Sequence, residues 1–129
     1  MFKMETTDVS QIYNECEVWR ENLRSFRNEF NQHQKELLAL AAMHPEKEVQ
    51  KEIEHFQNQF HIQLINIHDL KQSVKAQDRK VRIEQSMNEG TISEETITDH
   101  ELLYDQVQKL EQIIQELKNE FKDFLEQTG

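Results

Sequence analysis

Apolar residues recur at alternating spacings of three and four along three long stretches of the chain. This heptad spacing puts one apolar stripe along one face of an α-helix. It predicts helices over about residues 8–43, 46–88 and 93–127. The predicted stripes are Ile12, Cys16, Trp19, Leu23, Phe26, Phe30, His33, Leu37 and Leu40; then Val49, Ile53, Phe56, Phe60, Gln63, Ile67, Leu70, Val74, Gln77 and Val81; then Leu103, Val107, Leu110, Ile114, Leu117, Phe121 and Phe124.

Two short breaks separate the predicted helices. Pro45 lacks an amide hydrogen and therefore fits the first turn of the second helix. Gly90 readily adopts the left-handed conformation that ends helices, so it predicts the end of that helix. The start of the third helix stays open, because two Thr-x-x-Glu motifs, Thr91–Glu94 and Thr98–Glu101, both match a capping box.

Breaks of a few residues force neighbouring helices to run antiparallel. When the chain is folded back at Pro45 and again at Gly90, the three apolar stripes match one another layer by layer. The predicted fold is all-α, an elongated, coiled-coil-like antiparallel three-helix bundle with a left-handed supercoil, forming one domain over residues 1–129. Association of helices between chains is the alternative that a heptad pattern leaves open. The matched layers are Trp19/Leu70/Leu110, Leu23/Ile67/Ile114 and Phe30/Phe60/Phe121.

Composition and charge exclude several classes of protein. Two glycines and one proline are too few for the turns of a β fold. The net charge of −10 opposes binding to nucleic acid or to an anionic membrane surface. Neither the start, Met1–Glu5, nor any later window has the apolar length of a signal peptide or a membrane span, so we expect a cytoplasmic protein. A lone cysteine, Cys16, excludes an intramolecular disulfide and a thiolate metal cluster.

Six histidines in an acidic helical protein raise the hypothesis of a metal-binding helical bundle. Metal ligands on a helix share a face at spacings of three or four, and the available pairs are Glu29/His33 and Glu52/His55. A ferritin-like di-metal site needs two Glu-x-x-His motifs on different helices, and the only such motif here is Glu52 to His55. We therefore expect neither a metal nor another cofactor.

His33 interrupts the apolar stripe of the first predicted helix. The layers place it opposite Phe56 and Phe124. A buried imidazole needs a hydrogen-bond partner or loses its charge. We therefore expect a partly buried ring with Glu29 or Glu36 beside it.

The segment Ile67–Ser73 reads Ile-His-Asp-Leu-Lys-Gln-Ser. It resembles the His-x-Leu-Lys-Gly-Ser/Ala motif of histidine phosphotransfer domains, which are also helical bundles. The resemblance implies His68 as a phosphoryl acceptor and Lys71, one turn further on, as the cation that faces the phosphate. The chain departs from that family at Gln72, where the family has glycine, and in providing three helices where the family has four.

Nothing else in the sequence points to catalysis. There is no convergent serine, histidine and acid set and no glycine-rich phosphate loop. A tightly packed three-helix core also leaves no room for the ~300 Å³ that a small-molecule site usually needs. We therefore expect no enzymatic activity.

One basic stripe runs along the second predicted helix. Antiparallel folding brings this end of the helix beside the acidic start of the third helix, so we expect the two sets of charges to pair. The cations are Lys71, Lys75, Arg79, Lys80 and Arg82, and their expected partners are Glu94, Glu95, Asp99, Glu101 and Asp105.

Two isoleucines of the second helix, Ile62 and Ile65, fall on the side away from its apolar stripe. A fourth helix, from another protein or from a second copy, could cover them. The sequence therefore predicts a non-enzymatic interaction or assembly module, with a histidine phosphotransfer protein or a metal-binding bundle as the alternatives. The candidate partner-binding residues are Ile62, Ile65, His61, His68 and Asp69.

Overall fold

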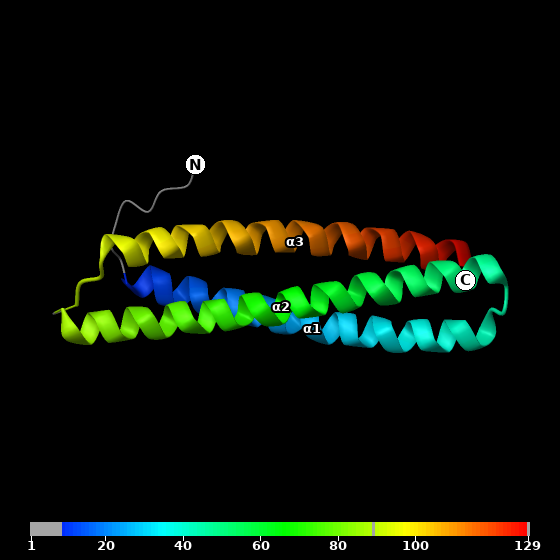
Figure 1. Ribbon diagram of the computed structural model, residues 1–129, viewed down its shortest axis with the longest axis horizontal. Coiled ribbons are helices and arrows are strands. Elements are labelled where there is room, and N and C mark those ends of the chain that lie inside the picture. Colours follow the sequence, from blue (N-terminus) through cyan, green and yellow to red (C-terminus); the bar gives the residue numbers. More distant parts are fainter. Residues whose placement is uncertain (1–8, 89, 129) are drawn as a thin grey trace.

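The computed structural model describes residues 9–88 and 90–128, which form three long α-helices (Figure 1). α1 spans Val9–Met43, α2 spans Lys47–Met87 and α3 spans Glu94–Thr128. Each end lies within one residue of the prediction, and the described residues contain no strand. The predicted all-α three-helix bundle is therefore confirmed. The predicted first helical residue, Asp8, and the segment Met1–Glu5 lie outside the described residues.

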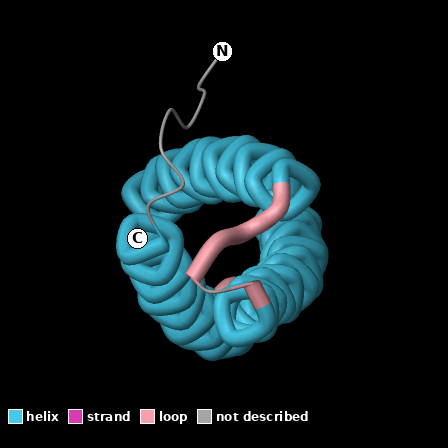
Figure 2. Tube along the Cα trace, turned by 90° about the vertical axis from the view of Figure 1, so that its left-hand side faces the viewer, coloured by secondary structure: helices cyan, strands magenta, loops and turns pink. Residues whose placement is uncertain are grey.

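α2 runs antiparallel to both of its neighbours, and the end of α3 lies near the α1–α2 connection (Figure 1). Viewed along the bundle, the three helices surround a common centre (Figure 2). The predicted stripes fill this centre, since nearly all of their members are buried. α2 has 41 residues and is therefore about 60 Å long.

The α1–α2 connection differs in detail from the prediction. α2 begins at Lys47 with Glu46 at its N-cap, so Pro45 precedes the cap and does not lie in the first helical turn. The Gln50 side chain donates a hydrogen bond to the Ala41 carbonyl at the end of α1. The side-chain amide of Gln50 therefore satisfies a backbone carbonyl that has no partner within α1.

Gly90 ends α2 as predicted. Its φ of 89° lies in the left-handed region, and its amide donates to the Gln85 carbonyl at 3.0 Å. A bond that reaches back five residues in this way closes the last turn of a helix.

The start of α3 corrects the prediction. Ser93 precedes the first helical residue, and its hydroxyl accepts a hydrogen bond from the Thr96 amide at 3.2 Å. Neither Thr-x-x-Glu motif, at residues 91–94 or 98–101, therefore provides the cap. Both predictions overlooked the serine between them, although serine is among the best N-cap residues.

Glu84 of α2 fastens the start of α3. Its carboxylate accepts hydrogen bonds from the Ser93 amide at 2.8 Å and from the Thr96 hydroxyl. These bonds favour the charged form, so they lower the pKa of Glu84 below its ordinary value. The Gln77 side chain adds a bond to the Thr96 carbonyl at 3.1 Å.

The aromatic layer of the predicted register is confirmed. The Phe60 ring centroid lies 4.8 Å from that of Phe30 and 5.0 Å from that of Phe121. Phe56 and Phe124, the next matched pair, lie 5.1 Å apart. The half of the bundle nearer Pro45 therefore contains phenylalanine rings from all three helices in its core.

His33 has the expected acidic partners but different aromatic neighbours. Its ring nitrogens lie 3.1 Å from the Glu36 carboxylate and 3.8 Å from that of Glu29. Its ring contacts Phe121 and Phe60 at 4.7 and 5.4 Å, which corrects the predicted position opposite Phe56 and Phe124. Helical side chains lean toward the N-terminus of their own helix, so the His33 ring lies nearer the level of Phe30, 6.2 Å away, than its Cα atom does.

Trp19 is buried in the same core cluster as Leu70 and Leu110, the two leucines of its predicted layer, and it also contacts two rings of α3. The indole stacks on His100 at 4.9 Å and meets Tyr104 edge-on at 6.1 Å. Both partners precede Leu110, so the indole reaches toward the N-terminal ends of α1 and α3.

His100 is a buried titratable group that the sequence analysis missed. Its Nε2 lies 3.1 Å from the Glu15 carboxylate, while its buried Nδ1 has no hydrogen-bond partner among the described residues. Burial lowers the pKa of His100 below its ordinary value, and Glu15 opposes this effect in part. Extending the α3 stripe back from Leu103 by three and then four residues would have found both His100 and Thr96.

The stripe assignment predicts a contrast between two leucines of α1. Leu23→Ala removes a side chain that is 1% exposed and should lower the free energy of unfolding by about 2–5 kcal/mol. Leu38→Ala removes one that is 64% exposed and should lower it by less than about 1 kcal/mol. Urea unfolding of both variants measures the difference, and equal losses would contradict the assignment.

His100 predicts a loss of stability in mild acid. Below its ordinary pKa of 6.5, the unfolded chain binds a proton that the folded site resists, so unfolding becomes easier as the pH falls. We expect the free energy of unfolding to fall by up to about 1.4 kcal/mol per pH unit between pH 6.5 and 5, and this group to have no effect above pH 7. Urea unfolding at pH 5, 6 and 7.5 measures this slope.

Two variants assign that slope to His100. His100→Leu should flatten it, whereas His61→Gln, which alters an exposed histidine, should leave it unchanged. An unaltered slope in His100→Leu would show that another group carries the pH dependence.

Candidate functional site

The structure places the predicted partner-binding residues on one exposed side of α2. Ile62 and Ile65 are 39% and 48% exposed. His61, His68 and Asp69 are exposed as well. Their spacings of three and four bring all five side chains to the helix face opposite the bundle core.

A third isoleucine, on α3, joins this side of the bundle. Lys80 and Asp99 form an ion pair at 2.7 Å, which fixes the register of the two helices. About four turns from that pair, antiparallel packing puts Ile113 across the groove from Asn66. Ile113 is 45% exposed, and it was overlooked because it directly precedes a stripe residue. We call Ile62, Ile65 and Ile113 the apolar face.

The predicted pairing of the basic stripe with α3 holds for Lys80, which binds Asp99. Arg82 instead binds Asp78 of its own helix at 3.1 Å, and its guanidinium lies 4.6 Å from the centre of the Tyr13 ring of α1. The prediction was wrong for Arg82 because it considered only how far along the bundle each charge lies, and not which neighbouring helix each charge faces. Lys80 lies on the flank of α2 that faces α3, whereas Asp78 and Arg82 lie on the flank that faces α1.

Lys71 shows that the α1 flank of α2 is strongly basic. Partial burial lowers the pKa of its amine, and so do the positive charges of Arg27, Lys75, Arg24 and Arg20, in that order. Three of these four cations belong to α1. The basic stripe of α2 is therefore not the sole basic feature of the sequence, because α1 contributes a second one that faces it.

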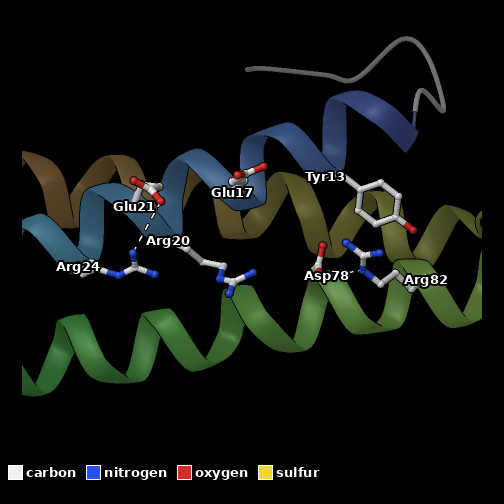
Figure 3. A pocket seen from close by; sticks show the side chains of 7 residues that line it. All are labelled: Tyr13, Glu17, Arg20, Glu21, Arg24, Asp78 and Arg82. Carbon is white, nitrogen blue, oxygen red and sulfur yellow. Dashed lines mark hydrogen bonds and ion pairs between the residues drawn. The ribbon is translucent and has the colours of Figure 1, made fainter.

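A surface hollow of about 290 Å³ lies between α1 and α2, and Arg20 and Arg24 are among the residues that line it. The prediction that the packed core leaves no room for such a space did not consider the grooves between the helices, where this hollow lies. Arg20 reaches from α1 toward α2, and Arg24 contacts Glu21 at 3.7 Å (Figure 3). The Arg20 Nε is buried and has no hydrogen-bond partner within residues 9–88 and 90–128. The hollow is lined by Tyr13, Glu17, Arg20, Glu21, Arg24, Asp78 and Arg82.

The candidate metal ligands and the cysteine do not gather into one cluster within the described residues. Within residues 9–88 and 90–128, no three His, Cys, Asp or Glu side chains gather so as to hold a metal ion. The two ring nitrogens of His33 contact the carboxylates of Glu29 and Glu36. The His55 ring packs edge-on against Phe56 at 5.2 Å. Cys16 is buried, which raises the pKa of its thiol to about 12 and keeps it in the unreactive protonated form.

His68 and Lys71, the residues of the phosphotransfer hypothesis, have different surroundings. His68 is exposed to solvent, whereas Lys71 is half-buried in the groove toward α1. The cations of α1 therefore lie near Lys71, one turn from His68.

None of the helices described is long and apolar enough to cross a membrane. Comparisons of the chain with protein families, with curated proteins and with solved structures found no match. The function is therefore inferred from the apolar face and the α1/α2 groove themselves.

Proposed function

We propose that this protein is a non-enzymatic helical interaction module that binds a helix of a protein partner, or of a second copy, on its apolar face. The observation that carries the proposal is the exposure of three isoleucines, two on the outer side of α2 and one, Ile113, at the groove between α2 and α3. Covering apolar surface contributes roughly 25 cal/mol per Å², so an apolar helix laid across these side chains gains free energy.

The groove between α2 and α3 supports a helical partner in particular. A hollow of about 130 Å³ there can accept a side chain from a fourth helix, which would pack as helices do in a four-helix bundle. α2 is one uninterrupted helix, so binding would cost little ordering of the backbone. The hollow is lined by Gln59, Gln63, Ile113, Glu116, Leu117 and Glu120.

A second candidate function is phosphoryl transfer through His68. The exposed His68 imidazole and the cations around Lys71 favour it, because a phosphoryl donor must reach the ring and its charge must be balanced. Incubation with radiolabelled acetyl phosphate, or with a histidine kinase and radiolabelled ATP, tests this function. The protein should take up labelled phosphate in an acid-labile form, and His68→Gln should take up none.

Ile65→Lys tests the proposed interaction module. The added charge should weaken self-association or partner binding at least about tenfold, because a lysine cannot be buried in an apolar contact. Helicity and thermal stability should stay nearly unchanged, since Ile65 is 48% exposed. Sedimentation velocity over a concentration series measures self-association, and quantitative cross-linking in the native cell measures partner binding.

Leu38→Lys is the matched control, because it makes the same change at an exposed leucine on α1. It should leave both kinds of association intact. An equal effect of the two substitutions, or no effect of Ile65→Lys, would contradict an interaction site at the apolar face.

A further inference from the structure

All five arginines of the chain lie in two short stretches, residues 20–27 and 79–82. Packing of α1 against α2 gathers most of them into one groove. Two contacts bracket this groove, from the Tyr13 hydroxyl to the Gln85 side chain at 2.6 Å and from the Gln34 side chain to the Gln57 carbonyl at 3.0 Å. We call its central residues, Arg20, Arg24, Arg27, Lys71 and Lys75, the basic groove.

Seven-residue spacing explains the crowding of charge. Arg20 and Arg27 follow Tyr13 and precede Gln34 at intervals of two helical turns, so all four occupy the same flank of α1. On the facing flank of α2, Lys71 likewise lies two helical turns before Asp78. The packing therefore sets cations of one helix against cations of the other.

Carboxylates neutralise only part of this charge. Arg24 contacts Glu21, and Asp78 is already bound to Arg82. Glu17 also lines the hollow, at the end nearer Tyr13. Over the described part of the chain, the other four cations of the basic groove have no carboxylate within 4.0 Å. They are Arg20, Arg27, Lys71 and Lys75.

The repulsion among these cations destabilises the fold, although the chain has 25 acidic residues against 15 basic ones. The buried Nε of Arg20 is a further cost, since no group in the described part of the chain accepts its hydrogen bond. An anion in the groove would offset the repulsion among these cations.

The charge distribution favours a compact anion. Guanidinium groups bind phosphate oxygens in pairs, and ammonium groups add point charges. The cations span about 10 Å along α1, from Arg20 to Arg27. A long polyanion would extend past this span onto a protein with a net charge of −10, which repels it.

From this arrangement we infer that the basic groove binds a compact, multiply charged phosphate group, from a free oligophosphate or from a phosphorylated side chain of a partner. The basic groove lies on the α1 side of α2, whereas Ile62 and Ile65 of the apolar face lie on the outer side of α2 and Ile113 lies on α3. The two proposals can therefore fail independently.

Isothermal titration with inorganic tripolyphosphate tests the site. The wild-type protein should bind it, and Lys71→Gln or Arg24→Gln should weaken binding about tenfold or more, because each removes one charge-assisted contact. Lys109→Gln is the matched control, since it removes one charge from an exposed lysine on α3. No binding by the wild-type protein, or equal weakening by the control, would overturn the proposal.

Thermal unfolding gives a second readout that shows whether the variants are folded. Without ligand, Lys71→Gln should unfold at the same temperature as the wild type or higher, because it relieves repulsion. Tripolyphosphate should raise the unfolding temperature of the wild type more than that of Lys71→Gln. If tripolyphosphate raised the unfolding temperature of Lys71→Gln as much as that of the wild type, the result would contradict binding at the basic groove.

Two further ligands identify the source of the phosphate. Tighter binding of a doubly phosphorylated serine peptide than of tripolyphosphate would assign the groove to a phosphorylated partner, and the reverse would assign it to a free oligophosphate. An RNA oligonucleotide that binds more tightly than both would overturn the inference of a compact anion.

Discussion

The bundle depends on one constraint, which is that three apolar stripes must share a single buried column. Once the stripes meet, every other position is assigned to a flank between two helices or to the outer side. In α1, Tyr13 and Gln34 bond to α2, whereas Glu15 and Glu29 bond to α3. The chemistry of each groove is therefore set by the flank on which a charged residue happens to fall.

This constraint explains why the fold was predictable and the basic groove was not. The three helices, the Phe30/Phe60/Phe121 layer and the end of α2 at Gly90 all follow from spacing and backbone chemistry. The arginines of α1 were missed because the charges were compared by their level along the bundle. The flank to which each charge belongs decides its neighbours, and the heptad position gives that flank.

The remaining differences arise where polar groups enter the core. Ser93, and not a threonine, caps α3 by accepting a hydrogen bond from the Thr96 amide. Glu84 of the preceding helix holds this cap in place, because its carboxylate accepts hydrogen bonds from the Ser93 amide and the Thr96 hydroxyl. His100 occupies a position of the α3 stripe where an aliphatic residue would be expected, and its ring stacks on Trp19. Such positions depend on partners from two or three helices, so a pattern read along one helix does not show them.

The two ends of the bundle differ in what holds them closed. Phenylalanine rings of three helices fill the core of the half nearer Pro45, and opening that half would expose a large apolar area. The end near Gly90 contains Gln77, Thr96 and His100, whose polar groups water can satisfy. Local opening should therefore begin at the Gly90 end and spread toward the rings, with amide hydrogen exchange fastest there. The basic groove lies between the polar core near Gly90 and the phenylalanine rings. An anion bound to both α1 and α2 there would oppose the spread of local opening from the Gly90 end.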